Sequence, residues 1–167
     1  MARTRTGTLS NVSALIALGA FAAIAAALAF EHVGGYRPCP LCLMERYAYY
    51  FGVPAALAAM FLARQGSANA ARLVLALAAL GFLMNAGLGV YHAGAEWKWW
   101  PGPDTCGNAA GLAGKVTDLL NKLNETRVIR CDEAPWRQFG LSFAGWSAVI
   151  SAALGLLGLA AAWTARR

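Results

Sequence analysis

The sequence predicts an all-α membrane protein, a bundle of four transmembrane helices with a short interfacial helix in the second outer loop. Of the 167 residues, 59% are hydrophobic and only 13% are charged, which is rare in a soluble domain. The apolar residues also form blocks close to the ~20 residues that a bilayer span requires. These blocks cover about 12–30, 47–63, 73–91 and 140–163, and none of them contains Lys, Arg, Asp or Glu.

Blocks of this kind favour helices, because a spanning segment must satisfy its own backbone hydrogen bonds as a helix or a closed barrel. The first block has one alternative reading as a cleavable signal, since Arg3 and Arg5 precede it. Its apolar stretch is longer than the roughly 7–15 residues usual for a signal. We therefore expect a retained first helix and a single membrane domain over 1–167.

The distribution of charge predicts the orientation. If both termini and the turn between the second and third blocks are cytoplasmic, that side carries six arginines and no acidic residue, as the positive-inside rule requires. The outer side then holds the loops at about 31–46 and 92–139, with all eight acidic residues. The net charge of +6 is thus a topology signal, and no nucleic-acid partner is expected. The six arginines are Arg3, Arg5, Arg64, Arg72, Arg166 and Arg167.

All four cysteines fall in the two outer loops. Cys39 and Cys42 lie in the first loop, and Cys106 and Cys131 lie in the second. This is the side of an inner membrane on which disulfides form and persist. Two cysteine pairs that face one compartment are able to exchange electrons, so the sequence predicts a membrane protein with redox-active thiols.

The first pair forms a Cys-Pro-Leu-Cys motif where the second helix is expected to begin. The positive end of a helix favours a thiolate. Arg46 follows Cys42 by one turn, about 6 Å along the axis, and its permanent charge is expected to stabilise a Cys42 thiolate. The alternative for Arg46 is an interfacial anchor that pairs with Glu45 or with a lipid phosphate.

The cysteines also have possible uses other than redox chemistry. A structural zinc site usually contains two closely spaced cysteine pairs, whereas Cys106 and Cys131 are far apart, so no metal is expected. Covalent haem attachment needs a His directly after the motif, where Leu43 stands. Structural disulfides remain an alternative. They are plausible for the long loop, which gains a few kcal/mol on closure, and weak for the short Cys39–Cys42 ring.

Two features of the third block add candidates. His92, just beyond it, is a candidate to donate a hydrogen bond or a proton to a bound carbonyl, and the alternative is an interfacial residue. Gly81, Asn85 and Gly89 recur every fourth residue and predict a face for close helix packing. We expect Asn85 to form an interhelical hydrogen bond rather than to bind a ligand.

These features together resemble the disulfide bond formation protein B (DsbB) family. The resemblance covers nearly the whole chain. It rests on the four spans, on a second cysteine pair around the expected interfacial helix, and on the run from Cys131 to Leu141. The most specific motif is Cys-x-x-Cys-x-x-Glu-Arg, which here reads Cys39-Pro-Leu-Cys42-Leu-Met-Glu45-Arg46.

The resemblance implies a bacterial inner-membrane thiol oxidase that reoxidises a periplasmic thioredoxin-fold oxidase (DsbA-like). It implies that a Cys106–Cys131 disulfide oxidises this partner, with Cys106 forming the mixed disulfide. Electrons then pass to Cys39 and Cys42, and from Cys42 to ubiquinone or menaquinone, which drives the cycle if it is the more oxidising acceptor. The expected quinone-binding residues are Arg46, Glu45 and His92.

One detail differs from the family pattern. Some members carry a quinone-contacting His two residues after the Tyr that ends the third span, whereas here His92 directly follows Tyr91.

Two other functions remain as alternatives. One is a vitamin K epoxide reductase-like quinone reductase, a family whose Cys-x-x-Cys lies in a late span. The other is a non-enzymatic four-span scaffold whose cysteines form structural disulfides.

Overall fold

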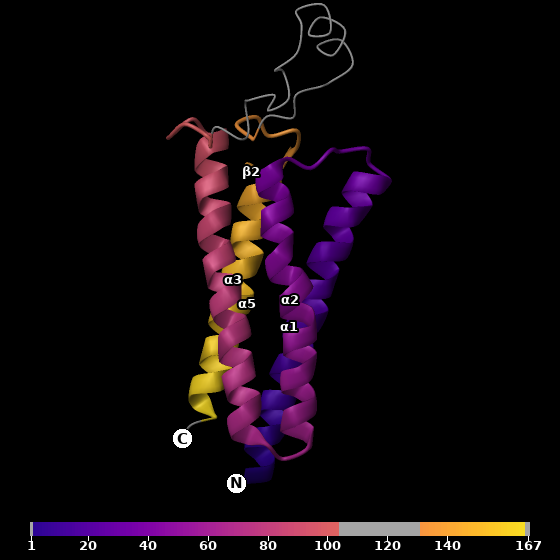
Figure 1. The fold of residues 1–167 in the computed structure, drawn as a ribbon, viewed down its shortest axis with the longest axis vertical. Coiled ribbons are helices and arrows are strands. Elements are labelled where there is room, and N and C mark those ends of the chain that lie inside the picture. Colours follow the sequence, from indigo (N-terminus) through magenta and orange to yellow (C-terminus); the bar gives the residue numbers. More distant parts are fainter. Residues whose placement is uncertain (1, 104–130, 166–167) are drawn as a thin grey trace, which may run out of the picture.

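The computed structural model describes residues 2–103 and 131–165, with side chains from residue 6 onward. Four helices in these ranges run side by side as an elongated bundle (Figure 1). They are α1 (Ala2–His32), α2 (Pro40–Arg64), α3 (Ala68–Glu96) and α5 (Phe143–Thr164). The predicted helical bundle is confirmed.

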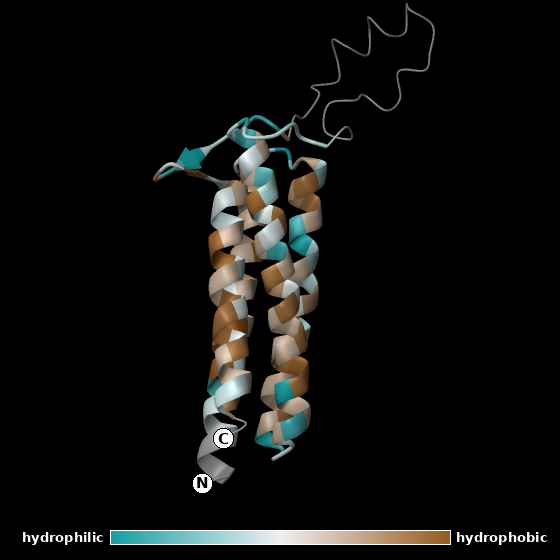
Figure 2. Cartoon of the chain, turned by 90° about the vertical axis from the view of Figure 1, so that its left-hand side faces the viewer, coloured by the Kyte–Doolittle hydropathy of each residue, from teal (hydrophilic) through white to brown (hydrophobic). Residues whose placement is uncertain are grey.

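Three of these helices are long and apolar enough to cross a membrane, namely α1 from Thr6, α3 and α5. Hydrophobic residues cover most of their length, and polar residues gather toward the ends (Figure 2). The span predicted at 47–63 lies in α2, which is long enough at 25 residues but carries tyrosines and Pro54 that lower its mean hydropathy. A fourth span therefore stays a prediction. The expected interfacial helix lies outside the described residues.

Helix boundaries differ from the predicted spans. Helix α1 begins ten residues before its apolar block, at Ala2, and α2 begins at Pro40. Helix α5 begins at Phe143 rather than Gly140, because β1 (Arg137–Gln138) and β2 (Leu141–Ser142) form a short antiparallel hairpin first. Its turn residues, Phe139 and Gly140, have φ values of 53° and 82°, as a type I′ turn requires. The Ser142 hydroxyl then caps α5 by accepting from the Gly145 N–H at 3.2 Å.

Small residues bring the helices close together. A Cβ at position 52 would lie 2.3 Å from Cζ of the buried Phe82 ring, so α2 reaches α3 only because Gly52 has no side chain. A Cβ at Gly89 would lie 3.0 Å from Cβ of Ala148 on α5. The predicted packing face is therefore confirmed at Gly89. It is wrong at Gly81, where a Cβ would meet nothing within 4 Å.

A buried polar group links three helices in the middle of the bundle. The Asn85 amide donates to the Ser151 hydroxyl at 2.9 Å, and the Tyr49 hydroxyl lies 2.8 Å from the same oxygen. The interhelical hydrogen bond predicted for Asn85 is confirmed. It fixes the rotation of α2, α3 and α5 about their axes, because each side chain needs its partner in an apolar surrounding.

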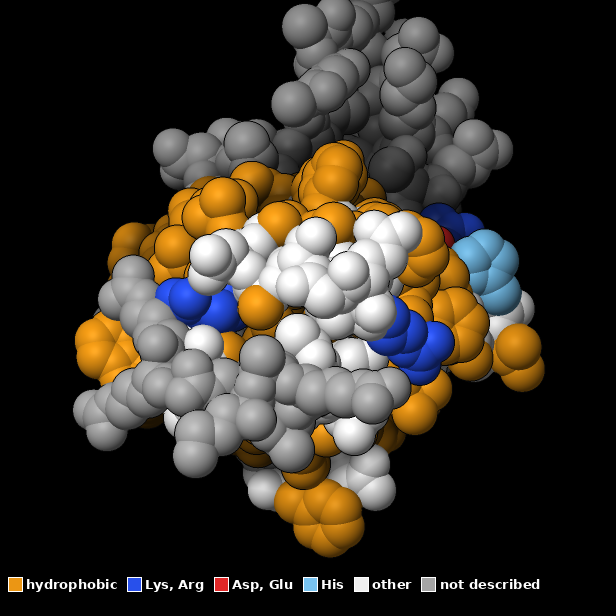
Figure 3. All heavy atoms as spheres, turned by 90° about the horizontal axis from the view of Figure 1, so that it is seen from below, with side chains coloured by type: hydrophobic (Ala, Val, Ile, Leu, Met, Phe, Trp, Pro, Cys, Tyr) orange, Lys and Arg blue, Asp and Glu red, His pale blue; other side chains and the backbone are white. Residues whose placement is uncertain are grey.

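Both termini and the α2–α3 turn lie at one end of the bundle, and the start of α2 lies at the other (Figure 1). Basic side chains appear at two places on the end that holds the termini (Figure 3). Arg64 donates to Ser10 Oγ at 3.3 Å, and Arg72 donates to the Ala162 carbonyl at 3.0 Å. The charge distribution predicts that both termini and the α2–α3 turn share one basic end of the molecule, and they do so here (Figure 1). The assignment of each end to a compartment stays a prediction.

Candidate active site

The Cys-x-x-Cys motif opens helix α2, as predicted. Cys39 is the N-cap residue and Pro40 is the first helical residue, a position that suits proline because its missing N–H is not needed there. The Cys39 sulfur accepts the Cys42 backbone N–H at 3.2 Å and lies 2.8 Å from the Cys42 sulfur. Both are free thiols, so the structure shows this pair as a dithiol in direct contact.

The contact between the two sulfurs makes them unequal. The hydrogen bond between the two sulfurs lowers the pKa of Cys39 below its ordinary value of 9.0, although burial opposes this shift. The same hydrogen bond, with burial added, raises the pKa of Cys42. A lowered pKa at Cys42 therefore has no support from this dithiol and stays a prediction. The main physical cause is the contact between the two sulfurs, which favours the thiolate at Cys39 and disfavours it at Cys42.

Cys131 lies on one side of this dithiol. It is 1% exposed and forms a small buried cluster with Cys39 and Leu41. Cys131 is disulfide-bonded, whereas Cys39 and Cys42 are not. Cys106 lies outside the described residues, so its predicted pairing with Cys131 and its contact with a partner protein stay predictions.

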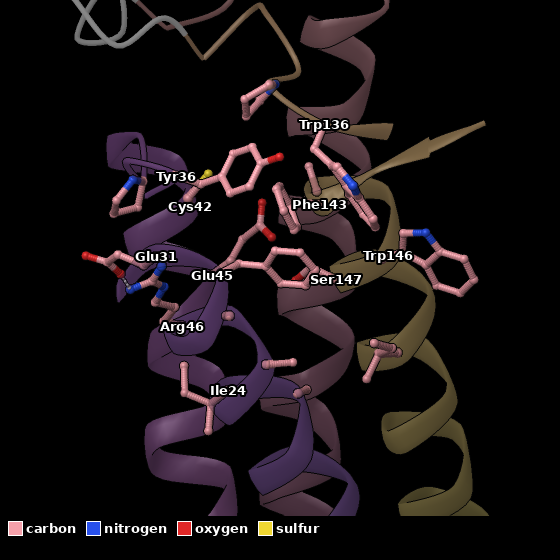
Figure 4. A pocket seen from close by; sticks show the side chains of 18 of the residues that line it. Ile24, Glu31, Tyr36, Cys42, Glu45, Arg46, Trp136, Phe143, Trp146 and Ser147 are labelled. Atoms are coloured by element: carbon pink, nitrogen blue, oxygen red, sulfur yellow. Dashed lines mark hydrogen bonds and ion pairs between the residues drawn. The ribbon is translucent and has the colours of Figure 1, made fainter. Parts of the chain in front are cut away.

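A cavity of about 430 Å³ lies beside the dithiol, and Cys42 is part of its wall. Side chains of α1, α2 and α5, of the segments beside them and of the end of α3 surround it (Figure 4). Most of the wall is apolar and aromatic. The Phe143 ring lies 4.7 Å from the stacked Trp136 ring and 5.0 Å from the Phe30 ring, measured between centroids. The wall thus offers flat apolar surfaces beside one thiol.

Arg46 also lines the cavity, but its partner differs from both sequence readings. Its guanidinium forms an ion pair with Glu31 of α1, which lines the cavity as well (Figure 4). The predicted contacts with a Cys42 thiolate or with Glu45 are not the ones that the structure forms. The ion pair holds Arg46 at the cavity wall, so its role in binding a quinone stays a prediction.

His92 is buried near the dithiol and is not part of the cavity wall. The side chain is buried, with Nδ1 2.7 Å from Glu45 Oε1 and Nε2 3.5 Å from Cys39 Sγ. It is not among the residues that line the cavity, whereas Glu45 is. Figure 4 shows the Glu45 side chain directed toward the rings of Tyr36 and Phe143. His92 therefore connects Cys39 to Glu45 instead of facing the expected quinone position.

Glu96 is a site residue that the sequence reasoning missed. It is the last residue of α3, is 7% exposed and lines the cavity. Its Oε1 lies 3.9 Å from His92 Nε2. Its Oε2 is buried without a hydrogen-bond partner among the residues that the structure describes. The available signal was the spacing of four residues from His92, which places both side chains on one helix face.

Comparison with known proteins assigns the chain to a family. The profile described as "Disulfide bond formation protein DsbB" matches residues 10–161. The chain belongs to the DsbB family. A disulfide bond formation protein B of Verminephrobacter eiseniae is 32% identical over 92% of this chain and 85% of its own length. One of Polaromonas naphthalenivorans is 29% identical over 87% of this chain and 86% of its own length. No solved structure gives a significant match.

Membership in the DsbB family confirms the resemblance read from the sequence. It implies a membrane protein that acts as an oxidoreductase in disulfide bond formation. The free dithiol at the start of α2 and the membrane-length helices agree with that general role. Because the match covers most of the chain, the vitamin K epoxide reductase-like and scaffold alternatives have no further support.

Proposed function

We propose that this protein is a quinone-dependent thiol oxidase of the bacterial inner membrane, which reoxidises a DsbA-like thioredoxin-fold partner in the periplasm. One observation carries the proposal: the dithiol lies between Cys131 and a large apolar cavity. Cys39 and Cys131 belong to one buried cluster, against which Cys42 also packs, and of the two motif thiols only Cys42 lines the cavity. This supports exchange of the motif with the second cysteine pair and transfer from Cys42 to a lipid-soluble acceptor.

The exchange step follows from the burial of Cys131 against Cys39. After the partner has reduced the loop disulfide, the Cys131 thiolate attacks Cys39 of the Cys39–Cys42 disulfide, and Cys42 leaves as a thiolate. Cys106 then attacks Cys131, which regenerates the loop disulfide and releases Cys39. Two electrons have moved to the motif, and each step is a thiolate attack through a mixed disulfide.

The second half of the cycle takes place at the cavity. A disulfide forms between Cys39 and Cys42, and the quinone accepts two electrons and two protons and leaves as the quinol. A volume of about 430 Å³ is in the range of small-molecule sites, which are mostly apolar with a few polar groups. Here Arg46 and Glu45 are the polar groups on the wall that would face the quinone carbonyl oxygens.

Two protons must reach the quinone, and the structure suggests a different route for each. Cys42 lines the cavity and delivers its proton there. Cys39 is buried, but His92 Nε2 lies 3.5 Å from its sulfur and His92 Nδ1 lies 2.7 Å from Glu45. With Nδ1 protonated, His92 takes the Cys39 proton and passes its own to Glu45, which lines the cavity.

The membrane placement is part of the proposal. Helix α2 is the fourth span, and the end with Arg64 and Arg72 faces the cytoplasm. The support is the positive-inside rule together with the position of both termini at that same end (Figure 1). The cysteines then face the periplasm, and the cavity lies near the membrane surface, where a quinone from the bilayer can enter.

Quinone absorbance in the presence of a reduced DsbA-like protein tests the proposal. Short-chain ubiquinone and menaquinone are compared as acceptors for the purified protein. We expect Cys42→Ser to abolish quinone reduction. Cys131→Ser is expected to abolish the reaction with the partner protein. When Cys39 and Cys42 are reduced chemically instead, the same variant should still reduce quinone. Quinone reduction at the wild-type rate by Cys42→Ser would reject the proposal.

A further inference from the structure

The dithiol has a third neighbour that suggests a second property of the site. Cys39, Cys42 and His92 place two sulfurs and one imidazole nitrogen within 4.8 Å of one another. Cys39 and His92 are buried, and Cys42 is partly buried. Thiolates and imidazole are the ligands that Zn²⁺ prefers in proteins. The spacing of the cysteine pairs does not predict this group, because its third member is a histidine from another helix.

The distances fit a tetrahedral ion with small movements. With Zn–S near 2.3 Å and Zn–N near 2.0 Å, sulfur and nitrogen ligands lie about 3.6 Å apart, and Cys39 Sγ to His92 Nε2 is 3.5 Å. Two sulfur ligands lie about 3.8 Å apart, against 2.8 Å here. A rotation of the Cys42 side chain that moves its sulfur by about 1 Å toward the cavity gives the required separation.

Glu96 supplies an independent reason to expect a cation. Its buried carboxylate lies beside His92, with Oε1 3.9 Å from Nε2, and its Oε2 has no hydrogen-bond partner in the described parts of the chain. Glu96 also has a hydrogen bond with the Ser142 side chain, but an unpaired buried carboxylate oxygen is still costly, and a cation close to it would lower that cost. Glu96 lies outside the group of three side chains whose ligand atoms are within 4.8 Å of one another, so a movement of its side chain toward the ion would make it the fourth ligand.

Glu45 provides the support that a metal-binding histidine usually has. Its Oε1 lies 2.7 Å from His92 Nδ1, which leaves Nε2 directed toward the sulfurs. Metal-bound histidines commonly donate their other ring N–H to a carboxylate, which fixes the tautomer and the orientation of the ring. The orientation of His92 is therefore set before any ion arrives.

We propose that the dithiol form of this site binds one Zn²⁺ ion through Cys39, Cys42, His92 and Glu96, and that the bound ion stops the redox cycle. Binding releases the two thiol protons, and no electrons move. Both sulfurs are then held as metal thiolates, so neither can attack a quinone or form the disulfide. The disulfide form has lost both thiolate ligands and releases the ion. The binding rests on geometry alone, and the inhibition rests on the proposed function.

Zinc binding is measured in the absence of quinone and partner protein. The full-length chain carries Cys106→Ser and Cys131→Ser, so that Cys39 and Cys42 are its only thiols. Reduced and oxidised samples are incubated with ZnCl₂, desalted and analysed for metal. We expect one zinc per chain in the reduced sample and none in the oxidised sample. Co²⁺ in place of Zn²⁺ should give a thiolate-to-cobalt charge-transfer band in the reduced sample alone.

Substitutions test the ligand set by competition with a chromophoric chelator. His92→Ala and Glu96→Gln are expected to weaken zinc binding more than Glu45→Gln, whose loss of an outer hydrogen bond typically costs about 10–100-fold. His32→Ala is the matched control, because His32 lies outside the proposed site and its Nδ1 is 3.0 Å from the Leu28 carbonyl oxygen of its own helix. It should bind zinc as the parent chain does.

Equal zinc content in the reduced and oxidised samples, a comparison that leaves all four proposed ligands in place, would overturn the proposal. Unchanged affinity in His92→Ala would overturn it as well. Inhibition is tested separately, with zinc added to reduced wild-type protein before quinone. A metal-free protein that fails to reduce quinone contradicts the proposed function and leaves the zinc site standing. A protein that reduces quinone but binds no zinc contradicts the zinc site alone.

Discussion

Replacing Glu45 with Gln tests the proton route through His92. Gln keeps the size of the side chain, and its amide oxygen can accept from His92 Nδ1 in the place of Oε1, which now lies at 2.7 Å. The amide cannot take up and release a proton. The substitution therefore separates proton transfer from the packing and hydrogen bonding of the same position.

The expected effect is on the rate constant rather than on quinone affinity. General acid–base groups contribute about 10²–10⁴-fold to a rate. Since Cys42 delivers one of the two protons without Glu45, we expect the lower end, about a 100-fold smaller kcat, or about 2.7 kcal/mol in the barrier. Arg46 and the aromatic wall are unchanged, and the Gln amide can still donate a hydrogen bond to a quinone carbonyl, so the KM for quinone should stay the same.

Single-turnover mixing of the reduced protein with short-chain quinone measures this rate directly. A solvent deuterium isotope effect on the step should be larger in Glu45→Gln than in the wild type, because proton delivery becomes limiting. Glu31→Gln is the matched control, since Glu31 is a second cavity carboxylate whose ion pair is with Arg46. It should change KM and leave kcat. A Glu45→Gln protein with the wild-type kcat would refute the route.

Three further predictions follow from the same contacts. Arg46→Gln should raise the KM for quinone about tenfold, or about 1.4 kcal/mol, because a hydrogen bond to a charged group contributes at least this much binding free energy. An unchanged KM would show that Arg46 is only the structural partner of Glu31. Asn85→Ala should lower the free energy of unfolding by about 0.6–1.7 kcal/mol without loss of oxidase activity, and detergent-unfolding curves that match the wild type would contradict this. In the reduced protein the ultraviolet absorbance of thiolate should rise at a pH below the ordinary 9.0 of cysteine, because the pKa of Cys39 is lowered. Cys39→Ser should remove this step, and a step that remains would assign it to another thiol.

The candidate site was only partly predictable from the sequence. Local rules were sufficient for the motif: a Pro at the first helical position and a cysteine before it place the dithiol at the start of α2. The same rules could not assign the lower pKa to one of the two sulfurs, because that depends mainly on the contact between them. They also gave Arg46 the wrong partner, since Glu31 belongs to a helix that precedes the motif.

What the sequence determined by itself is what short-range physics controls. Apolar blocks of membrane length predicted the helices. The arginines predicted that both termini and the α2–α3 turn lie at one end of the bundle. The Cys-x-x-Cys spacing predicted that the two sulfurs of the motif lie close together. Only the tertiary structure decided which neighbour each sulfur has. His92 meets Cys39 across 53 residues and Glu45 across 47. Such contacts depend on the rotation of each helix about its own axis, which is fixed by packing at Gly52 and Gly89 and by the hydrogen bonds around Asn85, that is, by partners on other helices.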